Sequence, residues 1–152
     1  MSLATPRAVV RRSASAALWV RILLQVLIGG VTVATAIGKA FDVPGFVRVI
    51  DTYQLLPPVL FEPVAIAVIV GELVLGAWIL SGWRLAPAAL LAIAMYAAWV
   101  VLLTVTLLRG LDLQNCGCFG IFLARPLRWY SPLEDVVAMG LSWLLYRLAW
   151  RA

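Results

Sequence analysis

Hydrophobic residues gather in four long runs along the chain, and each run is about as long as a transmembrane helix. A helix rises about 1.5 Å per residue, so about 20 apolar residues cross the hydrocarbon core of a bilayer. The third run has no charged residue, and the second has a single acid, Glu72. The predicted transmembrane helices cover residues 17–38, 63–81, 87–108 and 132–150.

This pattern predicts an all-α integral membrane protein, in which residues 1–152 form one domain, a bundle of four transmembrane helices. The first run could instead be a cleaved signal peptide, because it follows a basic segment and contains an A-x-A-like site at residues 34–36. Its apolar stretch is longer than the usual core of a signal peptide, which favours a transmembrane helix.

The segment between the first two runs carries a shorter pattern. Phe46, Val49, Ile50 and Tyr53 recur at helical spacing, and the prolines at 57–58 would end a helix there. The pattern predicts a short amphipathic helix in the first outer loop, lying on the outer membrane surface. It could be a connector packed over the bundle or a docking surface for a partner.

The composition agrees with a membrane protein. Of the 152 residues, 64% are hydrophobic and only 12% are charged, whereas a soluble domain is about half apolar and a quarter charged. The chain has no histidine, which excludes histidine-ligated haem or zinc and any Ser/His or Cys/His catalytic pair within it. The net charge of +5 does not indicate nucleic-acid binding, because the basic residues flank the apolar runs.

The basic residues also predict the orientation. If the N-terminus is cytoplasmic, seven basic residues face inward and five face outward, as the positive-inside rule favours. Both termini then lie in the cytoplasm, and both longer loops lie outside the cytoplasmic (inner) membrane. The inner residues are Arg7, Arg11, Arg12, Arg21, Arg84, Arg147 and Arg151, and the outer ones are Lys39, Arg48, Arg109, Arg125 and Arg128.

The only two cysteines, Cys116 and Cys118, lie in the second outer loop on either side of Gly117. Outside the cytoplasm a disulfide can form and persist. A bridge between them requires a bend at Gly117, and it would stabilise the fold little because the loop it closes is so short. These features favour a pair that switches between dithiol and disulfide over a structural staple.

Two further properties bear on the thiols. Two thiolates do not complete a tetrahedral zinc site, so a metal site would need ligands from a second subunit or from solution. Three arginines of the same loop would favour a thiolate if they fold near it: Arg109, Arg125 and Arg128.

Two charged residues of the helical runs are candidates for function. Glu72 lies near the bilayer centre, where an acid is unfavourable unless it faces other helices. It could be a protonated clamp between helices, or it could handle protons or contribute to a quinone site. Lys39, the only lysine, is expected to extend to the membrane interface, and pairing with Asp42 is the alternative.

Four short motifs follow one another along the chain: GKAFD at 38–42, YQLLP at 53–57, GELVLG at 71–76 and CGCFG at 116–120. Together they resemble the MauE family of methylamine-utilisation membrane proteins, within the wider group of DoxX-like four-helix membrane proteins. The resemblance implies thiol–disulfide chemistry outside the cytoplasm with a thioredoxin-like partner of the MauD type, serving the maturation of methylamine dehydrogenase. It also implies that Cys116 and Cys118 are the redox pair and that Lys39, Asp42 and Glu72 are shared polar positions.

The sequence therefore predicts a membrane thiol–disulfide redox protein that exchanges electrons with an extracytoplasmic thioredoxin-like protein. A membrane quinone could be the final electron donor or acceptor, although no motif specifies one. The alternative is a non-catalytic membrane anchor or assembly factor for such a redox partner. A small-molecule or metal transporter is disfavoured, because the runs contain one central acid and show no duplicated halves.

Overall fold

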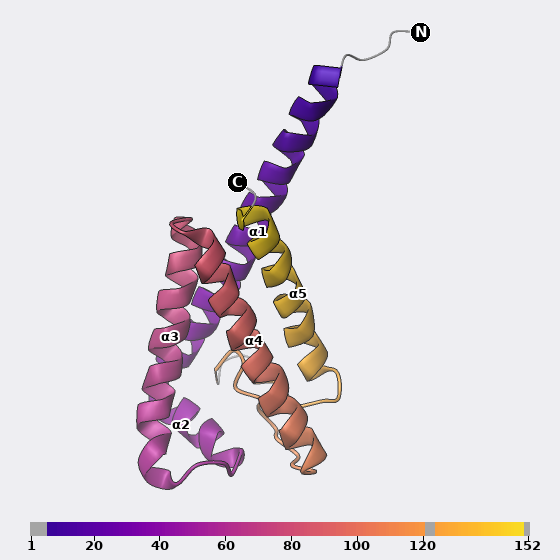
Figure 1. The fold of residues 1–152 in the computed structure, drawn as a ribbon. Helices are drawn as coiled ribbons and strands as arrows, with labels where there is room; N and C mark the ends of the chain where they lie inside the picture. The colour runs from indigo at the N-terminus through magenta and orange to yellow at the C-terminus, as the bar shows by residue number, and fades with distance from the viewer. Residues whose placement is uncertain (1–5, 121–123, 151–152) are drawn as a thin grey trace.

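The computed structural model describes residues 6–120 and 124–150, with side chains described from residue 16 onward. All regular secondary structure in this part of the chain is helical (Figure 1). The elements are α1 (Pro6–Ala40), α2 (Val43–Thr52), the short 3₁₀ helix η1 (Pro58–Leu60), α3 (Phe61–Ser81), α4 (Leu85–Leu108) and α5 (Ser131–Trp150).

Three helical segments among the described residues are long and apolar enough to cross a membrane: Ala16–Ala40, Pro58–Ser81 and Leu85–Leu108. Many of their large apolar side chains are exposed, as suits helices that face lipid. The chain is therefore a multi-pass membrane protein. The fourth predicted span forms α5, which carries two acids in its first turns and Arg147 near its end, and its crossing of the membrane stays a prediction.

The long helices pack as two close pairs, α1 with α3 and α4 with α5. Glycines allow the first pair to approach closely, because a Cβ on Gly76 would lie 2.7 Å from Val33 Cγ2 and 3.0 Å from the Gly29 carbonyl oxygen. A tight turn joins α3 to α4, with Gly82 in the left-handed conformation at φ +70°. The core between the pairs, near this turn, includes Ile79, Ala92 and Leu145.

Helix α2 packs against α3, and its apolar face is buried by protein. Phe46, Val49 and Tyr53 are buried in one cluster with residues of α3 and α4, including Ala65 and Leu103. The apolar face of α2 therefore covers protein rather than lipid, as a connector packed on the bundle would. The helix also ends at Thr52, before the prolines that were expected to end it.

Helix α2 is buried because α1 ends partway along α3. Lys39, in the last turn of α1, contacts Glu72 in the middle of α3, so the first half of α3 extends beyond the end of α1. Ala65 and Ile69 in that half are apolar and buried, and α2 supplies the surface that covers them. The segment between α1 and α3 thus packs, as α2, against the first half of α3.

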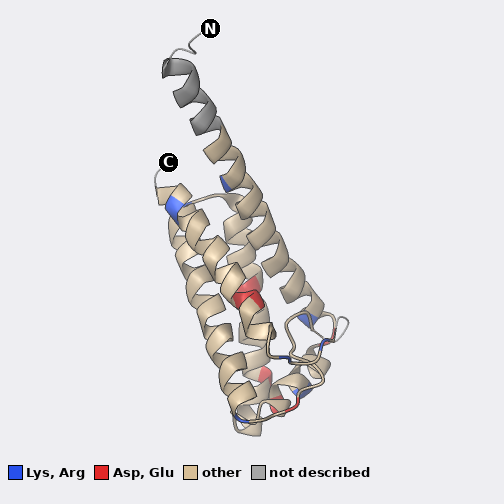
Figure 2. Cartoon of the chain, turned by 90° about the vertical axis from the view of Figure 1, so that its right-hand side faces the viewer, with Lys and Arg blue, Asp and Glu red and all other residues tan. Residues whose placement is uncertain are grey.

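The loops gather at one end of the molecule. Helix α2 and the segment that follows α4 lie at the end opposite the turn between α3 and α4 (Figures 1 and 2). The start of α1 and the end of α5 lie toward the same end as that turn. The two cysteines are therefore held among α2, the end of α1 and the start of α5.

Candidate functional site

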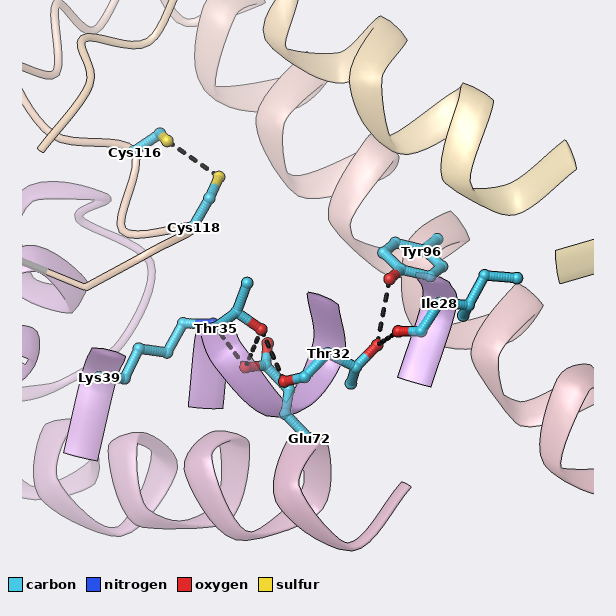
Figure 3. Close-up of polar contacts among 8 residues, drawn as sticks. All are labelled: Ile28, Thr32, Thr35, Lys39, Glu72, Tyr96, Cys116 and Cys118. Atoms are coloured by element: carbon cyan, nitrogen blue, oxygen red, sulfur yellow. Dashed lines mark hydrogen bonds and ion pairs between the residues drawn. The ribbon is translucent and has the colours of Figure 1, made fainter. Parts of the chain in front are cut away.

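The two cysteines lie in direct contact as free thiols. Their sulfurs are 2.9 Å apart and share a hydrogen bond (Figure 3). Gly117 between them makes the sharp bend, with φ +74°, a conformation that a side chain disfavours. A Cβ at this position would also lie 2.8 Å from Val49 Cγ1 on α2. The fold therefore requires glycine between the two thiols.

Hydrogen bonds fix the backbone around the thiols. The Tyr53 hydroxyl donates to the Cys116 carbonyl oxygen at 2.6 Å, and the Cys116 N–H donates to the Arg125 carbonyl oxygen at 2.9 Å. Asn115 Oδ1 accepts the Gly117 N–H at 2.8 Å. Burial raises the pKa of Tyr53, so its hydroxyl stays protonated and remains a donor. The pair is thus held in place from α2 and from both sides of its own loop.

The two thiols differ in acidity. The hydrogen bond between the two sulfurs lowers the pKa of Cys116 to about 6, and the charge of Arg125 acts in the same direction. The same contact, together with burial, raises the pKa of Cys118. Cys116, with the lowered pKa, is therefore the better nucleophile at neutral pH.

Arg125 lies close enough to act on Cys116, although its guanidinium also pairs with Glu134 at the start of α5, at 2.5 and 2.7 Å. Arg109, also expected to lie near the thiols, donates instead to the carbonyl oxygens of Tyr53 and Gln54. It therefore ties the end of α4 to the end of α2.

Lys39 and Glu72 form a buried ion pair. Lys39 Nζ lies 2.6 Å from Glu72 Oε2, and the two residues are only 3% and 4% exposed. Thr35 Oγ1 donates to the same carboxylate oxygen at 3.2 Å (Figure 3). The bonds from Lys39 and Thr35 connect α1 to α3.

The expected places of Lys39 and Asp42 are therefore corrected. Lys39 does not extend to the membrane interface or pair with Asp42, because α1 ends inside the bundle, where Glu72 is within reach. Asp42 instead caps α2 by accepting the Gly45 N–H at 2.8 Å. A protonated Glu72 was expected because burial disfavours a charged carboxyl group; this stays a prediction, and the structure adds Lys39 Nζ beside the carboxyl oxygen.

A cavity of ≈ 420 Å³ brings the thiols and the ion pair together. Both cysteines and Gly117 line it, as do Lys39 and Glu72. Other polar or aromatic residues, among them Tyr53, Trp99 and Asp135, also line it and were not predicted as site residues from the sequence. Tyr53 belongs to the YQLLP motif and to the helical pattern that begins at Phe46, and nothing in the local sequence marks the other two.

The described residues do not gather three or more cysteine or acidic side chains in a way that could hold a metal ion. The arrangement suits proton and electron exchange. It places a polarised dithiol beside a buried acid–base pair in a mostly apolar cavity.

Comparison with known proteins gives a consistent family assignment. The family described as methylamine utilisation protein MauE matches residues 15–148. A protein named methylamine utilization protein MauE from Paracoccus denitrificans is 30% identical over 119 residues, which cover 78% of this chain and 64% of that protein. The chain thus spans somewhat less than two thirds of that relative's length. No solved structure matches this chain. Since the family match includes all of the helices that form the site, apart from the first turns of α1 and the last residues of α5, the chain belongs to the MauE family.

Proposed function

We propose that this protein is a membrane thiol–disulfide redox protein, which exchanges electrons through Cys116 and Cys118 with an extracytoplasmic thioredoxin-like protein of the MauD type. The observation that carries the proposal is the contact between the two free sulfurs at 2.9 Å. The same contact lowers the pKa of Cys116. A thiolate at neutral pH with a second thiol in contact is the arrangement that thiol–disulfide exchange requires.

The exchange conserves electrons and protons. The Cys116 thiolate attacks one sulfur of a partner disulfide, which releases the other partner sulfur as a thiolate and forms a mixed disulfide. Cys118 then attacks Cys116 Sγ, so that an internal disulfide forms and the partner leaves as a dithiol. Cys118 supplies one of the two protons that the partner's sulfurs take up, and solvent returns the proton that Cys116 had released; the reverse sequence oxidises a partner dithiol.

The membrane arrangement is part of the proposal. We infer that α5 is the fourth span of a DoxX-like bundle, supported by its close packing along α4. In this bundle the termini and the Arg84 turn face the cytoplasm, and α2 and the thiols face outward from the inner membrane. The Arg125–Glu134 ion pair would then lie at the outer end of α5, where water can solvate both charges.

Membership of the MauE family suggests the setting, a role in methylamine utilisation. In that setting the protein would support disulfide formation in an exported client such as methylamine dehydrogenase. The lowered pKa of Cys116 favours this redox role over a non-catalytic anchor, because an anchor has no need of a reactive thiolate.

Trapping of a mixed disulfide tests the proposal. The Cys118→Ser variant lacks the thiol that resolves the intermediate, so it should accumulate a disulfide between Cys116 and a thioredoxin-fold protein in cells that express both. The Cys116→Ser/Cys118→Ser variant is the control and should trap nothing. Full client maturation by the double variant would show that the protein acts as an anchor instead.

A further inference from the structure

The cavity beside the thiols has the size of a small-molecule site and connects with the lipid-facing surface. Its volume of ≈ 420 Å³ lies in the range of ligand pockets. Two of its lining residues, Val31 and Leu55, are 40% and 47% exposed, so the cavity reaches the apolar outside of the helices. Val31 belongs to a segment that can cross the membrane. A ligand dissolved in the bilayer could therefore enter from the side.

The chemistry of the cavity wall is unevenly distributed. Most of the lining is apolar or aromatic, including Trp99, while Cys116 and Cys118 contribute their thiols. Lys39 is the only cation among the described residues that line the cavity. Its ammonium lies 5.9 Å from the centre of the Trp99 ring. Since an ammonium has three N–H donors and Glu72 accepts one of them, Lys39 can also donate to an oxygen atom of a ligand.

From this arrangement we infer that the cavity binds a membrane quinone, which oxidises the Cys116–Cys118 dithiol. The inference rests on the proposed thiol–disulfide function and adds its electron acceptor. The ring would lie in the apolar cavity beside Trp99, with one carbonyl oxygen accepting a hydrogen bond from Lys39. Membrane quinones accept electrons from protein thiols outside the bacterial cytoplasm, so the chemistry is accessible.

The reaction balances without any further reactant. Formation of the bond between Cys116 Sγ and Cys118 Sγ releases two electrons and two thiol protons. The quinone takes up both electrons, its two carbonyl oxygens take up both protons, and it leaves as a quinol. Lys39 acts as a positioning residue for the ring. Renewed oxidation of the pair then allows it to accept electrons from a partner dithiol.

The test uses the full-length protein, reduced and reconstituted in lipid nanodiscs without oxygen, with decylubiquinone as the probe. Quinol formation and loss of free thiols are both measured, and we expect equimolar quinol and disulfide. The Cys116→Ser/Cys118→Ser variant should form no quinol. Equilibration of the pair with glutathione is measured in the same preparations, and it reports thiol–disulfide exchange independently of the quinone.

Two matched variants of α3 test whether the cavity is the quinone site. Val68→Phe adds a ring to a residue that lines the cavity, and Val70→Phe adds one to an exposed residue outside the lining. Quinol formation should slow roughly tenfold or more in Val68→Phe, because the added ring occupies the space of the ligand. In Val70→Phe it should remain near that of the wild type. Glutathione equilibration should be unchanged in Val70→Phe, and in Val68→Phe it should fall less than quinol formation does.

An azidoquinone photolabel on the wild-type protein provides a second measurement that no folding defect can disturb. Labelled peptides should include Trp99 or the segment with Cys118. Equal quinol formation by Val68→Phe and Val70→Phe, or labelling confined to other segments, would overturn the quinone site while leaving glutathione exchange intact. A pair that reacts with neither glutathione nor quinone would overturn the proposed function itself.

Discussion

Lys39 of α1 and Glu72 of α3 lie 2.6 Å apart in the interior of the bundle, although 33 positions separate them in the sequence. They meet because α1 ends halfway along α3, and they line the same cavity as the two thiols. The pair therefore joins two membrane-crossing segments and forms part of the candidate site.

Removal of one charge from this pair should be more harmful than removal of both. Lys39→Met leaves a buried carboxylate without its cation, and breaking a buried pair in this way costs about 3–5 kcal/mol. The double variant Lys39→Met/Glu72→Leu should recover a large part of that loss, because no buried charge remains. The stability of both variants is measured by thermal unfolding in detergent. A double variant less stable than Lys39→Met would show that the pair is not a coupled unit.

Gly117→Ala should destabilise the cysteine loop for two separable reasons. The backbone at φ +74° disfavours a side chain, and the new Cβ would lie 2.8 Å from Val49 Cγ1. Gly110→Ala is the matched control, since its φ is +70° but no atom lies within 4 Å of the added Cβ. We expect about 1–2 kcal/mol of strain in both variants and an additional loss in Gly117→Ala.

The contribution of the clash can be removed separately. The added variant Gly117→Ala/Val49→Ala makes room for the new Cβ and should regain thiol reactivity toward the level of Gly110→Ala. Unfolding temperature and the rate of thiol alkylation report on stability and on loop geometry. Identical behaviour of Gly117→Ala and Gly110→Ala would show that contact with α2 does not shape the loop.

The reactivity of Cys116 should depend on pH with a midpoint near 6. Its pKa is lowered to about 6, so the thiolate predominates above that pH and is lost by protonation below it. Cys118, whose pKa is raised, should react little in the same range. Cys118→Ala removes the stabilising hydrogen bond and should move the midpoint upward, toward the ordinary thiol value of about 8.5.

Alkylation by iodoacetamide of the reduced protein, with the modified cysteine identified by mass spectrometry, follows this titration residue by residue. Arg125→Gln should move the midpoint in the same direction by a smaller amount, because the arginine's charge is a weaker influence than the hydrogen bond. An unchanged midpoint in Cys118→Ala would show that Cys118 does not lower the pKa of Cys116.

The orientation of the bundle predicts which side of the membrane exposes the thiols. A membrane-impermeant maleimide should label reduced Cys116 or Cys118 in spheroplasts without opening of the membrane. A cysteine introduced at Ser81, beside the turn expected in the cytoplasm, is the control and should be labelled only after permeabilisation. The opposite pattern would invert the proposed topology.

The helical segments were largely predictable, because apolar periodicity is a local property of the sequence. Three of the predicted runs match helices that can cross a membrane, and the spacing of Phe46, Val49 and Tyr53 identified α2. The bend at Gly117 also followed from local geometry, since two cysteines so close in sequence can meet only if the residue between them turns sharply.

Contacts between helices were not predictable, because they depend on the relative depth of each helix. The predicted surroundings of Lys39 were wrong, because the sequence does not show that α1 ends beside the middle of α3, next to Glu72. That the apolar face of α2 covers protein was not predictable either, because an amphipathic helix has the same pattern whether it covers lipid or protein. The cavity joining the thiols to Lys39 and Glu72 follows from both of these contacts.

A redox titration of the cysteine pair tests the central claim most directly. The reduced protein in nanodiscs is equilibrated with glutathione buffers of increasing oxidised fraction, and the thiol state of Cys116 and Cys118 is fixed by acid and read by mass spectrometry. Reversible two-electron conversion between dithiol and internal disulfide within the range of these buffers is the predicted result. A pair that remains wholly dithiol or wholly disulfide in every buffer would contradict the account.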